Sequence, residues 1–270
     1  MQQTILQAAD LILDAQGLIV LTGAGMGADS GIPTYRGVDG SWGKIQGELQ
    51  MPIEMVMNPA FVQANLGVMW DRFIRRIHSF QMITPHKGFD VLNHIGTQIF
   101  QDNYFHITSN IDGQLQKAGV SSAQILEIHG NIHYLQCTTP CQTNTWPVTA
   151  AMLDAVPWQI PTCPHCGAFT RPNVLLFQDN TFVRARVKNQ QAVFEQFKAA
   201  RWSQSFVLLE IGAGVQVKAI RLFSARLAQQ LKAPLIRINP YDSLVENPRH
   251  VSIALPALEA LQALAEHIKT

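Results

Sequence analysis

The chain has 270 residues, of which 47% are hydrophobic and 14% charged, and its formal net charge is +1 at pH 7. That length can bury a full core as one large domain, or as one domain with a small insertion, and the low net charge disfavours nucleic-acid binding driven by charge. No apolar run reaches the roughly 18 residues of a membrane span, and the amino terminus lacks the features of a secretory leader. We therefore expect a cytoplasmic protein that does not enter a membrane.

Short β-branched segments alternate with segments of helical period along most of the chain. The predicted strands are 18–21, 104–108, 124–128, 205–211 and 234–238. The predicted helices are 2–15, 86–95, 188–199, 216–230 and 256–268. This alternation is typical of α/β proteins, so we predict a Rossmann-like parallel sheet with helices on both faces.

Two segments interrupt that rhythm and predict a smaller domain. Residues 44–82 show helical spacing without a strand candidate, which indicates a helical insertion. Residues 133–171 hold all four cysteines and little periodicity, which indicates a ribbon held together by a metal. The Rossmann-like domain would then comprise residues 1–43, 83–132 and 172–270.

The cysteines form two close pairs, Cys137-x3-Cys141 and Cys163-x2-Cys166, with 21 residues between the pairs. Four thiolates at such spacing suit a closed tetrahedral zinc site. Because no coordination position is left open, the predicted zinc is structural rather than catalytic. Four unrelated free cysteines would fit this spacing poorly.

A glycine-rich turn follows the predicted strand 18–21. The run Gly23-Ala24-Gly25-Met26-Gly27-Ala28 fits G-x-G-x-x-A, in which glycines let backbone N–H groups approach a pyrophosphate. A glycine turn without a ligand is the alternative. Gly31 and Pro33 interrupt the helix that should follow, and no acidic residue ends a second strand about 20 residues on, so an ordinary dehydrogenase is disfavoured.

Polar residues follow two further strands, where open α/β sheets bind ligands. Asn110 and Asp112 come after strand 104–108, and His129 comes after strand 124–128, on the same strand face as Glu127. On residues alone two other interpretations stay open: an Asn/Asp turn that caps a helix, and a structural histidine.

Together and in order, these motifs resemble the sirtuin (Sir2) family of NAD-dependent protein deacylases. Residues 23–37 resemble GAGxSxxSGIPxFRG, Asn110-Ile111-Asp112 the end of QNID, and His129-Gly130 the family's His-Gly. The cysteines resemble its zinc ribbon, residues 171–174 its RPxVV strand and Ile238-Asn239 its adenine-side segment. The resemblance implies NAD as co-substrate, a structural Zn²⁺, and acylated lysines of proteins as substrates.

The resemblance also implies residue roles. His129 would be the general base for a hydroxyl of the nicotinamide ribose, a task suited to an ordinary pKa of about 6.5. Asn110 would orient the ribose and Asp112 the nicotinamide carboxamide. The other implied cofactor-binding residues are Gly23, Ala24, Gly25, Pro33, Tyr35, Arg36, Trp42, Ser109, Ile111, Gly212, Ala213, Gly214 and Asn239. The implied substrate residues are Arg75, Val174 and Phe177.

The chain departs from the family pattern at several motifs. Ser109 stands in place of the Gln of QNID, and Gly27 stands in place of the Ser of GAGxS. Gly212-Ala213-Gly214 replaces GTS, and Phe177-Gln178-Asp179 replaces FGE. Residues 251–254 form a shorter version of the GDA-type segment. Arg72-Phe73-Ile74-Arg75 keeps only the Arg of a Tyr-x-x-Arg pair that binds acidic acyl groups in some members; the alternative is a solvated helix face.

Three functions remain after this comparison. The leading one is protein lysine deacylation. The second is mono-ADP-ribosyl transfer to protein or NAD hydrolysis on the same fold, and the third is a sensor of NAD or ADP-ribose without turnover.

Overall fold

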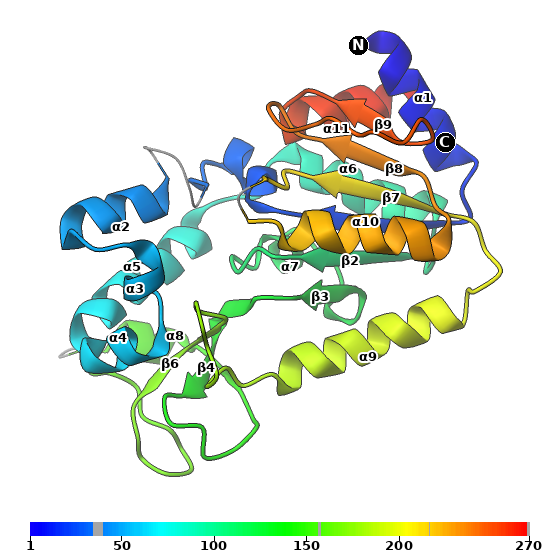
Figure 1. Ribbon diagram of the computed structural model, residues 1–270. Helices are drawn as coiled ribbons and strands as arrows, with labels where there is room; N and C mark the ends of the chain where they lie inside the picture. Colours follow the sequence, from blue (N-terminus) through cyan, green and yellow to red (C-terminus); the bar gives the residue numbers. More distant parts are fainter. Residues whose placement is uncertain (35–39, 156–157, 216, 269–270) are drawn as a thin grey trace.

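Six parallel strands form the main sheet, in the order β3-β2-β1-β7-β8-β9 (Figure 1). The computed structural model describes residues 1–34, 40–155, 158–215 and 217–268. The strands are β1 Gly17–Thr22, β2 Tyr104–Thr108, β3 Ile125–Glu127, β7 Phe206–Ile211, β8 Leu235–Ile238 and β9 Val251–Ile253. Every residue of β1, β2 and β7 is buried, which explains why these strands read as continuous apolar runs.

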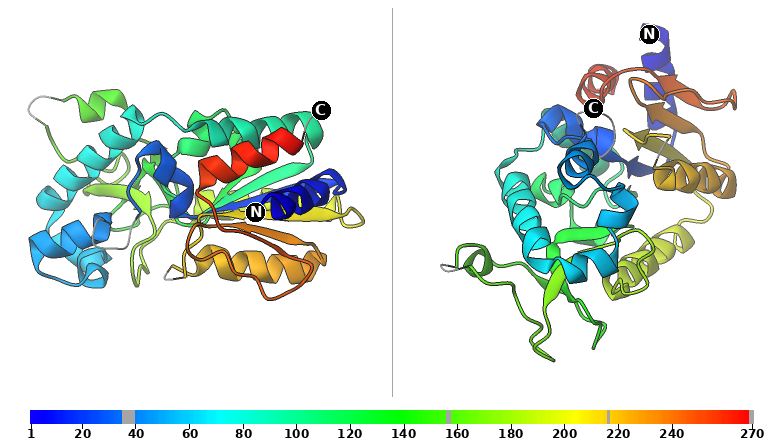
Figure 2. Two further views of the ribbon diagram at one scale, coloured as in Figure 1. Left: turned by 90° about the horizontal axis from the view of Figure 1, so that it is seen from above. Right: turned by 60° about the vertical axis from the view of Figure 1, so that its left-hand side comes forward.

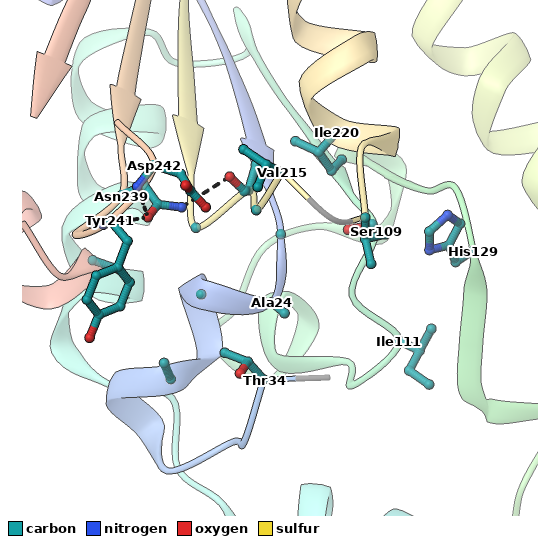
Figure 3. Close-up of a pocket in the computed structure, with 18 of the residues that line it drawn as sticks. Ala24, Thr34, Ser109, Ile111, His129, Val215, Ile220, Asn239, Tyr241 and Asp242 are labelled. Atoms are coloured by element: carbon teal, nitrogen blue, oxygen red, sulfur yellow. Dashed lines mark hydrogen bonds between the residues drawn. The ribbon is translucent and has the colours of Figure 1, made fainter. Parts of the chain in front are cut away.

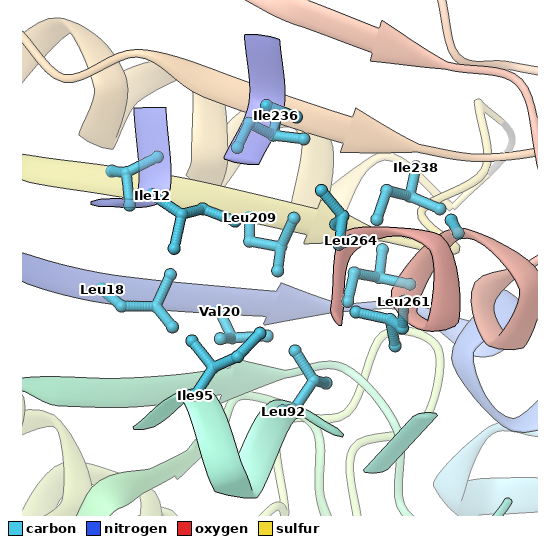
Figure 4. Packing of buried hydrophobic residues seen from close by; sticks show 14 of the residues in the cluster. Ile12, Leu18, Val20, Leu92, Ile95, Leu209, Ile236, Ile238, Leu261 and Leu264 are labelled. Carbon is cyan, nitrogen blue, oxygen red and sulfur yellow. The ribbon is translucent and has the colours of Figure 1, made fainter. Parts of the chain in front are cut away.

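Helices cover both faces of this sheet, which confirms the predicted α/β class (Figure 2). One face carries α1 Gln2–Leu13, α6 Lys87–His94 and α11 Ala257–His267; the other carries α9 Ala185–Ala199 and α10 Ala219–Leu231. On the first face Ile12 and Leu264 pack against Leu18 and Leu209 (Figure 4). Burying these side chains from water is the main term that holds the helices to the sheet.

The strand order reverses at β1. From β1 the chain builds β2 and β3 on one side, and later β7, β8 and β9 on the other. A crevice therefore opens between the carboxyl ends of β1 and β7, where sheets of this kind bind ligands.

A second part of the fold contains a helical segment and a three-stranded antiparallel sheet in the order β5-β4-β6 (Figure 1). The helices are α2 Ser41–Leu49, α3 Ile53–Val56, α4 Pro59–Ala64 and α5 Leu66–Met82. The strands are β4 Gly130–Cys137, β5 Trp146–Pro147 and β6 Thr170–Val174, with the short helix α8 Ala150–Leu153 between β5 and β6. Trp70 of α5 joins the two layers, because its indole nitrogen donates to the Thr170 carbonyl at 2.8 Å.

Short elements account for most differences from the sequence prediction. These are η1 Ala24–Ser30, η2 Ile95–Ile99, α7 Gln114–Lys117 and η3 Ser122–Gln124. The glycine turn thus leads into a 3₁₀ helix, and α6 continues into one π-helical turn. Strand β9 was not predicted, because its three residues are too few to show alternation. Residue 216 of the predicted helix 216–230 lies outside the described residues, and α10 begins at Ala219. None of the described helices has the length and hydropathy to cross a bilayer.

Candidate active site at the carboxyl edge of the sheet

A cavity of about 860 Å³ occupies the crevice at the carboxyl ends of β1 and β7. Figure 3 shows His129 at one end, Asn239, Tyr241 and Asp242 at the other, and Ala24 between them. The residues singled out from the sequence that line this cavity are Gly23, Ala24, Gly25, Ser109, Ile111, His129, Val174, Phe177, Gly212, Ala213, Gly214 and Asn239. Segments almost 220 residues apart in the chain thus share one site.

The two glycine turns after β1 and β7 lie directly against each other. A Cβ on Gly23 would be 2.7 Å from the Gly212 carbonyl oxygen, and a Cβ on Gly25 would be 2.7 Å from the Gly212 Cα. The Gly25 amide donates to that carbonyl at 3.0 Å. Glycine is required here because any side chain would separate the turns that form the cavity floor.

Gly214 differs from these glycines because nothing lies within 4 Å of the position its Cβ would take. It lines the cavity at the place where the family pattern has a serine. The space is therefore open to a side chain and to a ligand.

Restoring that serine should strengthen NAD binding. The Gly214→Ser variant should lower the Kd for NAD about tenfold, the effect of one added hydrogen bond to a charged phosphate, about 1.5 kcal/mol. Calorimetric titration with NAD measures this, and Gly214→Ala is the matched control without a hydroxyl. Equal affinities of the serine and alanine variants would contradict the prediction.

His129 lies half-buried on the cavity wall with a fixed backbone. Its carbonyl accepts from the Leu175 amide at 2.9 Å, and Gly130 follows with a φ of 77° and no room for a Cβ, which would be 2.1 Å from the Asn173 carbonyl oxygen. Burial lowers the pKa of His129, although a hydrogen bond to the Ser109 backbone opposes that shift. The imidazole is therefore neutral at neutral pH, as a general base must be.

Asn110 and Asp112 lie behind the cavity wall rather than on it. Both side chains line a small polar pocket of about 10 Å³. The Asn110 amide nitrogen donates to the Gly23 carbonyl at 2.9 Å, which places Asn110 next to the glycine turn. Asp112 accepts from the Gln114 amide at 2.9 Å, and burial raises its pKa to about 6.

Asn110 keeps one acceptor unpaired. Its Oδ1 atom is buried and has no hydrogen-bond partner within the described part of the chain. Buried acceptors are rarely left unpaired in native proteins. The open space at Gly214 suits a ligand with a phosphate group, whereas the unpaired Asn110 oxygen belongs to the small pocket behind the cavity wall.

The Asn239 side chain shapes the far end of the cavity. Its amide nitrogen donates to the Ala213 carbonyl at 3.1 Å, and its oxygen accepts from the Tyr241 and Asp242 amides, each at 2.9 Å. Tyr241 and Asp242 line the cavity, and sequence reasoning missed them. The rule that singled out Asn110 and Asp112 would have found them, because they follow β8 in the same way.

Two other lining residues come from places without a clear sequence signal. Asp29 accepts from the Leu258 amide at 2.8 Å and so links η1 to the start of α11. Met57 follows α3 and reaches the cavity from the helical part of the fold. Its carbonyl accepts from the Phe177 amide at 2.8 Å.

The implied substrate residues separate into two groups. Val174 and Phe177 line the cavity beside Leu175 and Leu176, so this end is apolar. Arg75 does not line it: the side chain is exposed on α5 and its Nε donates to the Asp71 carbonyl at 3.2 Å. Arg72 pairs with Glu48 at 2.8 Å.

Four implied cofactor residues remain. Tyr35 and Arg36 lie outside the described residues. Trp42 belongs to α2. Pro33 is exposed and precedes Thr34, which lines the cavity.

Gln178, beside the cavity residue Phe177, occupies a strained backbone conformation. It stands where the family pattern has the glycine of FGE, and its φ is 54°. Its neighbour Asp179 is buried and pairs with Arg171 at 2.7 Å, which holds the turn in this shape. A left-handed conformation costs a side-chain-bearing residue about 1–2 kcal/mol.

The Gln178→Gly variant should therefore be more stable by about 1 kcal/mol after the entropy cost of glycine. Urea unfolding of the purified protein measures the change. Gln191→Gly on the exposed face of α9 is the matched control, and it should lose about 0.5–1 kcal/mol. A loss of stability in both variants would contradict the strain at residue 178.

The four cysteines form one cluster at the end of β4. Their Sγ atoms all lie within 4.8 Å of one another. The Sγ atoms of Cys137 and Cys166 are 3.7 Å apart, and those of Cys141 and Cys163 are 3.6 Å apart. A tetrahedral zinc with Zn–S bonds of about 2.3 Å has sulfur atoms about 3.8 Å apart. The cluster therefore fits a structural zinc.

The chain is similar to known proteins over nearly its whole length. The model of the Sir2 family matches residues 23–218. An NAD-dependent protein deacylase of Aquifex aeolicus is 27% identical over 93% of this chain and 95% of its own length. NAD-dependent protein deacylase 2 of Archaeoglobus fulgidus is 27% identical over 100% of this chain and 98% of its own.

Solved structures share the same fold. One from work on the mechanism and regulation of Sir2 enzymes aligns with a TM-score of 0.71 at 26% identity, over 99% of this chain and 98% of that one. A Sir2 homologue in complex with NAD aligns with a TM-score of 0.73 at 24% identity, over 97% of this chain and 92% of that one.

Proposed function

Because this chain belongs to the Sir2 family, we propose that it is an NAD-dependent protein lysine deacylase, which transfers the acyl group to ADP-ribose and releases nicotinamide. Relatives that match nearly its full length carry the name NAD-dependent protein deacylase. NAD is its co-substrate, and the cysteine cluster holds a structural zinc.

One observation carries this proposal: a neutral, half-buried histidine lies on the same cavity as two glycine turns in contact. The turns are suited to a pyrophosphate, since their backbones leave room for one. The histidine is suited to proton transfer. Few functions other than chemistry on a bound nucleotide require both in one cavity.

Each residue group has a separate task in the proposed reaction. When bound, NAD supplies the ribose carbon that takes the acyl oxygen, with nicotinamide as the leaving group. His129 accepts a proton from a ribose hydroxyl at the ring nitrogen that Ser109 does not engage. Asn110 orients the ribose indirectly, through its hydrogen bond to the Gly23 carbonyl of the glycine turn. The apolar end at Val174 and Phe177 holds the acyl chain and the lysine stem.

We propose that Asp112, in its ionised carboxylate form, orients the carboxamide of nicotinamide. Its pKa, raised to about 6, means that it is ionised at neutral pH and becomes protonated as the pH falls through that value. Acid pH would then remove an acceptor needed for nicotinamide.

Product analysis tests the proposal. Purified protein is incubated with NAD and a panel of acyl-lysine peptides, and nicotinamide, free lysine peptide and acyl-ADP-ribose are quantified. Stoichiometric formation of all three supports deacylation. NAD consumption without acyl-ADP-ribose would contradict it.

A second candidate is transfer of ADP-ribose to protein, or NAD hydrolysis. It is supported by Ser109, a short side chain that lines the cavity where the family pattern has glutamine, so another nucleophile has more room. Labelled protein or free ADP-ribose would identify it. A sensor without turnover would bind NAD and release no nicotinamide on any substrate.

The proposal also covers the substrates of the protein and its cellular location. Acylated protein lysines are the expected partners. A cytoplasmic location is part of the proposal, and the four closely spaced thiols support it, because a reducing compartment keeps them available for zinc.

A further inference from the structure

Glu127 is a buried acid, two residues before His129, that the proposed reaction does not use. It ends β3, and its side chain is 1% exposed. A carboxylate so deeply buried is costly unless donors surround it. Its partners therefore indicate what it holds in place.

Four side chains from three other elements donate to the Glu127 carboxylate. Oε2 pairs with Arg186 of α9 and accepts from Gln190 of α9 at 3.0 Å. Oε1 accepts from Gln116 of α7 at 2.9 Å and from Asn131 of β4 at 2.5 Å. The Glu127 amide donates to Gln190 Oε1 at 3.0 Å, so backbone and side chain are both fixed.

The positive partner is itself held by packing. The Arg186 guanidinium lies over the Tyr134 ring, 4.2 Å from its centroid. A guanidinium that is stacked and paired with a carboxylate keeps one orientation. The strand that leads to His129 is thereby clamped between α9 and β4.

The same network reaches the turn that carries Asp112. Asn131 accepts from the His133 amide at 2.8 Å, and His133 Nε2 bonds to the Asp112 carbonyl at 3.0 Å. Asp112 and Glu127 also line the same small polar pocket. The two carboxyl groups are close enough for the charge on Glu127 to raise the pKa of Asp112, after the larger effect of burial.

We infer that Glu127 is a positioning residue, which fixes the strand leading to His129 and the turn carrying Asp112 in one relative geometry. This inference rests on the proposed function for the roles of His129 and Asp112. The charged or titratable groups facing the network are Arg186 from α9, His133 from β4, Lys117 from α7 and Asp112 from its turn.

The Glu127→Gln variant tests the inference, because it removes the charge and keeps the shape. Small displacements of reacting groups lower the rate strongly, so kcat should fall on the order of 10- to 100-fold. The KM for NAD should change less than about twofold, since the glycine turns lie elsewhere. Loss of a neighbouring negative charge should also lower the titration midpoint of Asp112.

That midpoint is measured without turnover, by NMR of protein labelled with ¹³C-carboxyl aspartate. The Asp112 signal is assigned with Asp112→Asn. An unchanged midpoint would show that the Glu127 carboxylate is not coupled to the turn that carries Asp112.

Glu210→Gln is the matched control. Glu210 is also fully buried in the main sheet, pairs with Arg237 at 2.5 Å and accepts from Ser224. The temperature of thermal unfolding should be lower in both variants than in the wild type, but Glu210→Gln should keep the wild-type kcat and Asp112 midpoint. If Glu127→Gln does not fold because Arg186 is left unpaired, the double variant Glu127→Gln with Arg186→Met removes both charges.

The outcomes separate the two claims. If the wild type is active and Glu127→Gln has the same kcat and the same Asp112 midpoint as the wild type, the inference is overturned. An equal loss of kcat in Glu210→Gln also overturns it. A wild type without NAD-dependent deacylation, in which the Asp112 midpoint still depends on Glu127, overturns the proposed function and leaves the network standing.

Discussion

Replacing His129 with alanine should lower kcat for acyl-lysine removal by about 10²- to 10⁴-fold, the usual contribution of a general base. The KM for NAD should stay nearly unchanged, because the glycine turns hold the phosphates independently of the imidazole. Assays of nicotinamide release and of acyl-ADP-ribose formation with one good peptide substrate measure both constants.

The pH profile gives a second test of the same role. Burial lowers the pKa of His129 below its ordinary 6.5. A base works when it is neutral, so kcat/KM should be constant above that lowered pKa and fall as the pH drops through it. Asp112, with a pKa of about 6, contributes to the same acid limb.

The control for His129→Ala is His94→Ala, because His94 is an exposed histidine in the last turn of α6 and does not line the cavity. It should keep wild-type kcat. Calorimetric binding of ADP-ribose by both variants shows that the site is still formed. If His129→Ala keeps more than about a tenth of the wild-type kcat, His129 is not the general base, since loss of a general base lowers kcat by more than that.

The main sheet could be predicted because its strands are buried on both faces. Segments such as 18–21 and 205–211 are therefore apolar without interruption, and the polar residues that follow them mark the ligand edge. Gly130 was also predictable as a turn residue, and the structure gives it a positive φ.

The second part of the cavity could not be predicted in the same way. Met57 and Leu176 line it because a helical segment and the end of a small sheet meet in space, and no local pattern records that meeting. The direction in which the Arg75 side chain points depends on how α5 packs, and a short motif cannot specify that packing. Asn239 has the expected place, but its side chain bonds to the Ala213 carbonyl and to an amide of its own loop, and those partners can be identified only from coordinates.

Glu127 is a second example of contacts that the sequence does not predict. Strand alternation predicted that Glu127 and His129 share one strand face, but β3 ends at Glu127 and the two residues line different pockets. The donors to Glu127 come from residues 116, 131, 186 and 190, which the sequence keeps apart. Side-chain networks between elements are therefore the information that only the folded structure supplies.

Replacing Cys137 with serine should remove the zinc and loosen the three-stranded sheet. Structural zinc sites contribute apparent binding free energies of about 10–16 kcal/mol in small domains, so loss of one thiolate is a large change. Zinc measured by mass spectrometry should fall from about one ion per chain to near zero. Cys137→His, which keeps a ligand, should retain most of the metal, and Thr143→Ser in the same exposed loop should retain all of it.

The effect should pass from the cluster to the cavity by a defined route. Cys137 pairs with Thr170 across β4 and β6, and β6 ends at Val174, which lines the cavity. Phe177 lies on the same segment, whereas the glycine turns belong to the main sheet. The KM for the acyl peptide should therefore rise severalfold more than the KM for NAD, and thermal unfolding should begin at a lower temperature. A zinc-free variant with unchanged peptide KM would show instead that the cluster stabilises the ribbon without supporting the substrate end of the site.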